Sequence, residues 1–326
     1  MTKRVIDLGR EKPLLDIASY GRAGPASITR AELELIDRTV RRSPEVVVKV
    51  SGGARTLAGV EGHLRYIGRS GRLALESDSG ERVGGKGIES VLIEDWNLDL
   101  EARARRTQRS IRTARRPPKL VHNLIFSMPA GTPPKLVLRA VRKLARDQFG
   151  SDHRYALVLH TDEPHPHVHL VVKAVSEQGE RLNIRKATLR EWRRDFAANL
   201  RELGVAANAT ERAVRGNSRS SKPDEIYRAN QRGVSLIVRE RADARVRSDS
   251  ADALARERLL LTRVEVVKGW RGLGERLASA GYGSLAASIE HFLDEMPSMR
   301  ASAELNETRA RPGGSPSHLY TTEKTR

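Results

Sequence analysis

Apolar residues follow two different periods along this chain, and each period predicts a different kind of element. Short runs rich in β-branched and other apolar residues predict strands at residues 45–50, 120–129, 155–160 and 165–175. Apolar side chains spaced three and four residues apart predict helices at residues 56–69, 135–149 and 187–203. This order predicts an α+β domain whose largely antiparallel sheet carries helices on one face.

The same pattern predicts three regions along the chain. Residues 1–44 mix polar and apolar positions and predict an N-terminal arm with one short helix near 30–41. Residues 45–215 hold the predicted sheet and helices, and a polar, Arg- and Ser-rich stretch ends them. Residues 216–326 show helical patterns at 226–261 and 262–296, followed by a polar tail, and predict a mostly helical region of unknown role.

The composition narrows the class of partner. The chain has 326 residues, a formal net charge of +18 and no cysteine. A basic excess of this size, carried mostly by arginine, favours nucleic acid, because the planar guanidinium donates two hydrogen bonds to a phosphate. No apolar run is long enough to span a bilayer, and the N-terminus lacks the apolar core of a secretory signal. We therefore expect a cytoplasmic protein without disulfides or membrane insertion.

Residues 160–169, which read HTDEPHPHVH, hold four of the nine histidines of the chain. Apolar runs on both sides predict a β-hairpin around them. Because side chains alternate along a strand, His165, His167 and His169 would project from one face. His160, at the end of the preceding strand, can converge on the same point.

Converging imidazoles indicate a bound metal ion. His167 and His169 would give two ligands on one strand face, whereas His165 could be a ligand, a substrate contact or neither. Asp162 would supply a carboxylate that fixes the tautomer of a ligating imidazole. The alternative is a surface cluster without a ligand. The histidines alone leave open a hydrolytic zinc site, an oxygenase-type site or a nuclease.

A tyrosine lies in the first helix of this domain. Tyr66 points away from the apolar stripe of the helix, with Gly59 and Gly62 beside it on the exposed face. Arg65 and Arg69 are close enough to hold the phosphates of a substrate. By itself this pattern favours an ordinary surface tyrosine. Together with a metal site it favours DNA nicking, since a phenol attacks phosphorus once a metal polarises the phosphate.

A basic run links the first helix region to the second strand. Residues 102–119 contain eight basic residues and no acidic one. The run predicts either a solvated linker or a phosphate contact, and the two alternatives carry equal weight. In the second case the contacting side chains would be Arg105, Arg106, Arg115 and Arg116.

Three motifs resemble those of conjugative relaxases, in the HUH endonuclease superfamily. The histidine motif HTDEPHPHVHLVV begins at His160, and the tyrosine motif HLRYIGRSGRL surrounds Tyr66. The segment HNLIFSMPAGT between them resembles the intervening strand of the subgroup that includes the T-DNA border endonuclease of agrobacteria. A tyrosine that precedes the histidines is typical of relaxases, and the resemblance covers about residues 45–210. One position departs from the pattern, because Pro164 stands where an acidic residue is expected and the nearby carboxylate is Glu163.

The resemblance implies a role for each matching residue. Tyr66 would be the nucleophile, and His160, His167 and His169 would be the metal ligands, commonly for magnesium or manganese. Asp162 would orient a histidine or help to deprotonate the tyrosine. The implied activity is that of a site- and strand-specific DNA endonuclease that nicks single-stranded DNA at a transfer origin and stays attached to the 5′ end. The implied partners are accessory mobilization proteins and the coupling protein of a type IV secretion channel, through which the adduct is exported.

Two alternatives stay open. A replication initiator or transposase uses the same metal and tyrosine chemistry, although it places the motifs in the opposite order. A basic mobilization accessory protein could bind DNA without catalysis and hold a structural metal. An exposed phenol at Tyr66 has no use in such a protein.

Overall fold

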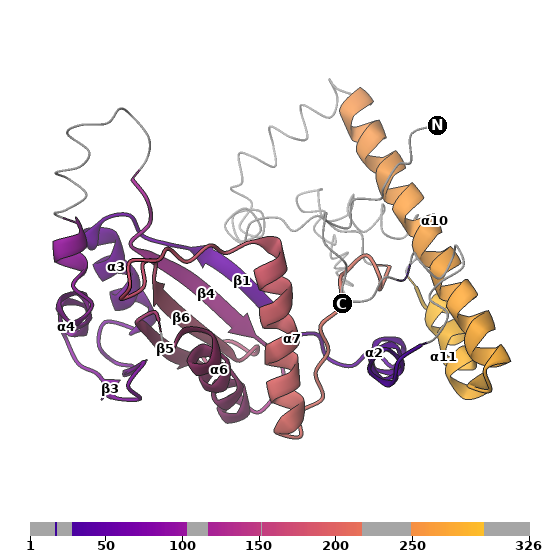
Figure 1. The fold of residues 1–326 in the computed structure, drawn as a ribbon, viewed down its shortest axis with the longest axis horizontal. Coiled ribbons are helices and arrows are strands. Elements are labelled where there is room, and N and C mark those ends of the chain that lie inside the picture. Colours follow the sequence, from indigo (N-terminus) through magenta and orange to yellow (C-terminus); the bar gives the residue numbers. More distant parts are fainter. Residues whose placement is uncertain (1–16, 18–27, 103–116, 151, 217–248, 297–326) are drawn as a thin grey trace, which may run out of the picture. The chain divides into compact units, whose positions relative to one another are not determined.

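The computed structural model describes residues 17, 28–102, 117–150, 152–216 and 249–296 (Figure 1). The chain divides into two compact units. Among the described residues, the sheet unit contains 34–102, 117–150 and 152–210, and the helical unit contains 17, 28–33, 211–216 and 249–296. The division predicted from the sequence, into regions 1–44, 45–215 and 216–326, stays a prediction.

A six-stranded sheet forms the centre of the sheet unit, in the order β1-β4-β6-β5-β2-β3. Its strands are β1 (Val47–Gly52), β2 (Leu75–Ser77), β3 (Arg82–Val83), β4 (Val121–Ser127), β5 (Tyr155–His160) and β6 (His167–Lys173). Every strand pair is antiparallel. The α+β class, the antiparallel sheet and the histidine hairpin, formed by β5 and β6, are therefore confirmed.

One face of the sheet packs against α6 (Pro134–Phe149) and α7 (Lys186–Glu202). Alternate residues of β6 supply the sheet side of this core, because Val168, Leu170 and Val172 are all fully buried. The rings of Phe126 and Phe196 meet edge to face, with 5.4 Å between their centroids. These contacts fix β4 and β6 in register beneath α6 and α7.

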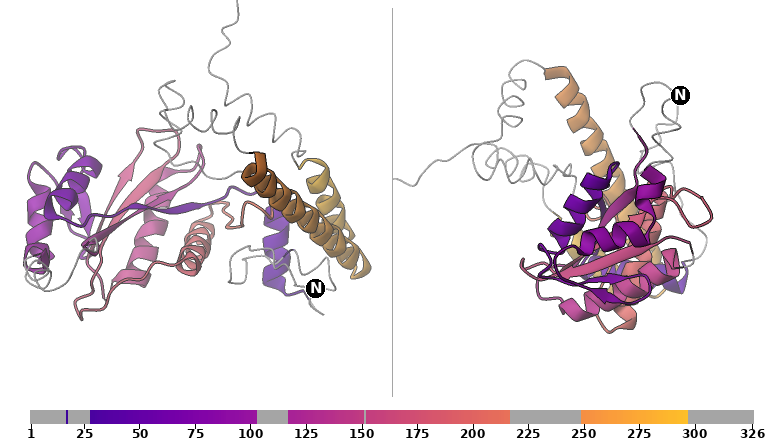
Figure 2. Two further views of the ribbon diagram at one scale, coloured as in Figure 1. Left: turned by 90° about the horizontal axis from the view of Figure 1, so that it is seen from above. Right: turned by 90° about the vertical axis from the view of Figure 1, so that its left-hand side faces the viewer.

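The opposite face packs against α3 (Leu57–Ile67) and α4 (Ile88–Asp95). Val121, Val158 and Val171 supply the sheet side of this second core. The expectation of helices on one face only is therefore wrong, and Figure 2 shows the sheet between two helical layers. The central strands β5 and β6 are buried at almost every position because both of their faces are covered.

Two further helices fall where the sequence predicts them. The short helix of the N-terminal region is α2 (Arg30–Val40). The third helix of the domain is α7, but one of its side chains does not follow the prediction. The helical period of residues 187–203 predicts that Arg190 faces outward, but its side chain is buried.

The helical unit contains α10 (Asp249–Ser279) and α11 (Gly283–Asp294). The rings of Trp270 and Phe292 pack edge to face between them, with 5.2 Å between centroids. The expected break near residue 261 is wrong, because α10 runs through it and the chain turns at residues 280–282. The predicted helix over 226–248 lies outside the described residues. In the described part of the chain, no helix combines the length and apolar character needed to cross a membrane.

Candidate active site

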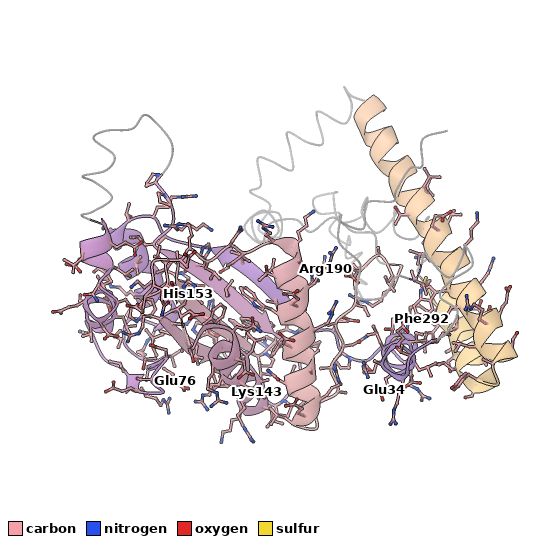
Figure 3. All side chains as sticks on the ribbon, in the orientation of Figure 1. Glu34, Glu76, Lys143, His153, Arg190 and Phe292 are labelled. Atoms are coloured by element: carbon pink, nitrogen blue, oxygen red, sulfur yellow. The ribbon has the colours of Figure 1, made fainter. Side chains whose placement is uncertain are left out.

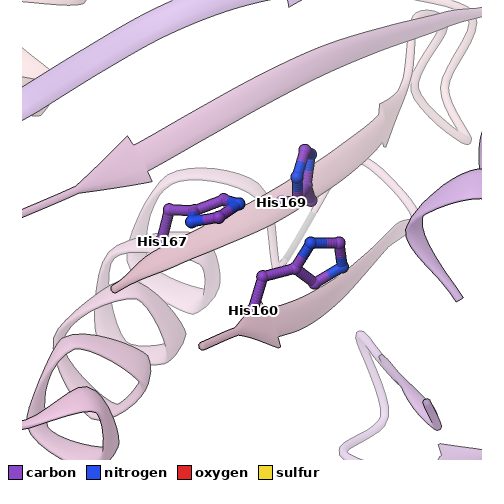
Figure 4. A group of neighbouring side chains, drawn as sticks. All are labelled: His160, His167 and His169. Atoms are coloured by element: carbon purple, nitrogen blue, oxygen red, sulfur yellow. The ribbon is translucent and has the colours of Figure 1, made fainter. Parts of the chain in front are cut away.

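Three histidines converge on the sheet face that carries α3 (Figure 4). His160 is paired directly with His167 across β5 and β6, and Val158 is paired with His169. Since residues opposite one another in an antiparallel pair share a face, all three imidazoles project from the same side. One nitrogen from each ring lies within 4.8 Å of the others. We call His160, His167 and His169 the histidine cluster.

Burial favours the neutral form of two of these imidazoles, those of His160 and His169. His160 and His169 are buried beneath α3. Burial, and then the neighbouring His160 and His167, lower the pKa of His169 to about 3. Burial also lowers the pKa of His160. Neutral imidazoles keep the lone pairs that a metal ion requires.

Hydrogen bonds fix the tautomers of two cluster members. His160 Nε2 donates to the backbone carbonyl of Ile67 at 2.7 Å, and His167 Nδ1 donates to the carbonyl of His165 at 3.0 Å. His160 Nδ1 and His167 Nε2 are then the nitrogens with lone pairs to offer. His169 Nδ1 is buried without a hydrogen-bond partner among the described residues. Three converging imidazoles, two of them buried and one with an unsatisfied nitrogen, fit a divalent transition-type ion.

Two residues with open roles lie outside this cluster. His165 precedes β6, is exposed, and contributes its backbone carbonyl to the orientation of His167. Glu163 lies in the exposed loop between β5 and β6. The geometry therefore assigns His165 a contact to a cluster member through its backbone.

Tyr66 lies at the edge of the histidine cluster. Its ring centroid is 6.4 Å from that of His169, and the two rings are nearly perpendicular at 87°. The side chain is 56% exposed, as the helical pattern of α3 predicts. A Cβ atom added at Gly62 would meet nothing within 4 Å, so the helix surface beside the phenol is open. Its catalytic role stays a prediction, but the structure brings it to the histidines.

His63 is a neighbour of Tyr66 that the sequence reasoning did not single out. It lies one helical turn before Tyr66, and the two rings stack at 28° with 6.4 Å between centroids. His63 also lies against the ring of His169, with 6.3 Å between the two centroids. Burial lowers the pKa of His63 to about 4. The spacing of three residues before the tyrosine was the signal that could have identified it.

A left-handed turn follows α3. Arg69, Ser70 and Gly71 have φ values of 52°, 56° and 87°. The left-handed conformation costs a non-glycine residue on the order of 1 kcal/mol or more. At Gly71 a side chain would also clash with the backbone of Gly85, whose carbonyl carbon would lie 2.5 Å from the added Cβ. This turn lies directly after α3, and the Arg69 side chain extends from it to Tyr66, His160 and Asp162.

Arg69 joins three elements of the site. Its guanidinium carbon lies 5.3 Å from the centroid of the Tyr66 ring, within the range of a cation–π contact. One of its terminal nitrogens lies 3.2 Å from His160 Nδ1 and forms an ion pair with Asp162. Asp162, predicted to act on a histidine or on the tyrosine, is thus linked to both through Arg69.

The other predicted DNA contacts have different surroundings. Arg65 pairs with Glu61 and with Glu89. Glu89 is buried, so the Arg65 guanidinium already compensates a buried carboxylate. Arg105, Arg106, Arg115 and Arg116 lie outside the described residues.

Comparisons with known proteins agree with this geometry. Residues 75–204 match the family of MobA/VirD2-like relaxases, in the nuclease domain. That range includes the histidine cluster and begins after Tyr66.

Three curated relatives also match. All are named T-DNA border endonuclease VirD2. The relative from Agrobacterium fabrum is 26% identical over 233 residues, which cover 64% of this chain and 49% of the relative. The relative from Rhizobium rhizogenes is 26% identical over 229 residues, covering 64% of this chain and 50% of the relative. The one from Rhizobium radiobacter is 27% identical over 186 residues, covering 53% of this chain and 43% of the relative.

The chain thus spans about half the length of the curated relatives it matches. The predicted resemblance to relaxases of the VirD2 kind is confirmed.

Proposed function

We propose that this chain is a relaxase that cuts one strand of DNA at a transfer origin and holds the 5′ end as a phosphotyrosine. In this reaction the Tyr66 oxygen attacks phosphorus and the bond from phosphorus to the 3′ oxygen breaks. The phenol loses a proton and the departing 3′ oxygen gains one. The new ester retains the energy of the broken phosphodiester, so the strand can be rejoined.

The relationship between Tyr66 and His169 is the observation that carries this proposal. An exposed phenol lies edge-on to a buried imidazole that belongs to a set of three, with 6.4 Å between the ring centroids. A scissile phosphate can therefore contact the phenol and the histidine cluster at the same time. A DNA-binding protein without catalysis would not need this arrangement.

The histidine cluster would hold a divalent ion, with magnesium or manganese as the proposed choice. When bound, the ion would polarise the phosphate and stabilise the charge that develops on its oxygens. The carbonyls of Ile67 and His165 would keep two of the imidazoles oriented for this task.

Arg69 would contact the phosphate beside Tyr66. Its guanidinium lies against the phenol ring, and Asp162 holds it there. A planar guanidinium can bind two phosphate oxygens at once. We therefore propose Asp162 as a residue that positions Arg69, and Arg69 as the residue that orients the phosphate.

The wider role follows from this reaction. The substrate would be single-stranded DNA at the origin, in the cytoplasm of a donor cell. Accessory mobilization proteins and the coupling protein of a type IV secretion channel would be the partners that export the adduct to a recipient. Arg105, Arg106, Arg115 and Arg116 remain proposed phosphate contacts.

Single-stranded DNA that carries the cognate origin tests the activity. The protein is incubated with this DNA and Mn²⁺, then analysed on a denaturing gel. The proposal predicts a protein–DNA adduct and a released fragment that ends in a free 3′ hydroxyl, both abolished by a chelator. Cleavage without an adduct would indicate hydrolysis and contradict the tyrosine reaction.

A further inference from the structure

A row of basic side chains follows the outer face of α6. Lys135, Arg139, Arg142 and Arg146 are spaced four, three and four residues apart, which places them on one side of the helix. Lys135, Arg139 and Arg146 are exposed, and Arg142 is half-buried. We call these four residues the α6 stripe. With a rise of 1.5 Å per residue, it extends over about 16 Å.

Much of the charge of the α6 stripe is not neutralised within the sheet unit. Arg142 forms an ion pair with Glu76 of β2, and Glu76 is labelled in Figure 3. In the part of the chain that the structure describes, Lys135, Arg139 and Arg146 form no ion pair with an acidic side chain. Three cations in a row, held by a straight helix, therefore face solvent.

The α6 stripe borders a groove between α6 and the end of α7. The groove has a volume of about 320 Å³, and both Arg139 and Arg146 line it. Its floor includes Asn199, and its single carboxylate, Glu202, lies 3.5 Å from Lys143. The remaining cations give this groove a positive lining.

The α6 stripe lies on the opposite side of the sheet from the histidine cluster. The inner side of α6 packs with Val168 and Leu170, whereas the histidines project with Val171 toward α3. The DNA nucleotides that occupy the nuclease site therefore cannot contact α6 as well. Whatever binds the α6 stripe is a second segment or a second molecule.

We propose that the α6 stripe is a second DNA-binding surface, which takes the phosphate backbone of double-stranded DNA. This inference rests on the proposed function, because DNA that is nicked on one strand is flanked by duplex. A length of about 16 Å corresponds to about five nucleotides of one duplex strand at 3.4 Å each. A rigid row of cations fits the fixed phosphate spacing of a duplex better than the variable spacing of a single strand. The stripe positions the DNA and reads no sequence.

The test measures binding of duplex DNA by the full chain. The probe is a fluorescent 30-base-pair duplex of mixed sequence, titrated at several salt concentrations. The stripe variant carries Arg139→Ala and Arg146→Ala. The control variant carries Lys268→Ala and Arg271→Ala, which remove the same charge from exposed positions of α10. A circular dichroism melt verifies that both variants are folded.

The proposal predicts a change in the salt dependence of binding. Two lost phosphate contacts should reduce the slope of log K against log salt by about 1.8, which is roughly sixtyfold in affinity at 0.1 M salt. The control variant should keep the wild-type slope. A short single-stranded oligonucleotide that fills only the nuclease site should bind the stripe variant as it binds the wild type.

Three outcomes would overturn the proposal. An unchanged slope of log K against log salt in the stripe variant would show that the α6 stripe does not bind duplex DNA, and would favour an acidic protein partner. An equal loss in the control variant would show that only total charge matters. A loss confined to single-stranded DNA would refute the duplex assignment. Duplex binding is measured without cleavage, so the two proposals can fail separately. If the stripe variant shows the reduced salt slope but the wild-type protein forms no adduct with origin DNA, the α6 stripe is supported and the proposed function is refuted.

Discussion

The ring of Tyr66 lies edge-on to the ring of His169, at 87° and with 6.4 Å between centroids, although the two residues are more than a hundred positions apart in the sequence. The contact joins α3 to the central strand β6 and brings the exposed phenol to the buried imidazoles. The proposed chemistry depends on this contact.

The histidine cluster should bind Mn²⁺ through three side chains. Replacing His160, His167 or His169 with Ala removes one ligand, and each change should weaken binding by at least tenfold and abolish nicking. Calorimetric titration with Mn²⁺ measures the binding. His165→Ala is the matched control from the same loop, and its affinity should stay within a few-fold of wild type. An equal loss in all four variants would contradict the three-ligand set.

Arg69 should oppose metal binding while it promotes nicking. Its guanidinium lies 3.2 Å from His160 Nδ1 and so competes with a cation for the same lone pair. Arg69→Ala should therefore bind Mn²⁺ more tightly, by several-fold, and nick DNA at least tenfold more slowly. Arg82→Ala, which removes an exposed charge from β3, should change neither. Weaker metal binding in Arg69→Ala would show that the guanidinium supports the cluster.

Asp162 should act through Arg69. Asp162→Asn removes the charge that holds the guanidinium, so nicking should slow while Tyr66 and the cluster remain in place. In an Arg69→Ala background the same change should have little further effect, because the two side chains act as one pair. Full additivity of the two losses in a single-turnover assay would mean that Asp162 has a separate role.

Acid should destabilise the sheet unit partly through His122. Burial, and then Lys119 and Arg181, lower the pKa of His122 to about 4. The unfolded chain binds a proton near pH 6.5 and the folded chain does not, so the stability present above pH 6.5 is lost as the pH falls toward 4. Urea unfolding measures the free energy of unfolding at pH 7.5 and at pH 5. Between these values His122→Gln should lose about 1 kcal/mol less of this free energy than the wild type, after allowance for partial exposure. If His122→Gln lost as much unfolding free energy between pH 7.5 and 5 as the wild type, His122 would be excluded.

The local pattern predicted much of the site. The alternation of β6 and the turn after His160 were enough to predict a hairpin with converging imidazoles. The helical period of α3 was enough to place Tyr66 off the core face. These features depend on residues close together in the sequence, where periodicity determines which way a side chain points.

The pairing of distant elements could not be read from the sequence. The covering of both sheet faces depends on α3 and α4 packing over Val158 and Val171, and an apolar strand reads the same whichever helices cover it. The role of Asp162 likewise depends on a left-handed turn that directs Arg69 back over Tyr66. Such a turn is decided by tertiary contacts as much as by its own residues.

Mapping the covalent adduct tests the central claim most directly. Wild-type protein and Tyr66→Phe are incubated with origin-bearing single-stranded DNA and Mn²⁺, digested with protease, and analysed by mass spectrometry. Because the phenol is 56% exposed, loss of its hydroxyl should leave folding intact. Tyr282→Phe, at another exposed tyrosine, is the control. We predict a nucleotide on Tyr66 in the wild type and the control, and no adduct in Tyr66→Phe. An adduct of full yield in Tyr66→Phe, on Tyr20, Tyr155 or Tyr227, would contradict the account.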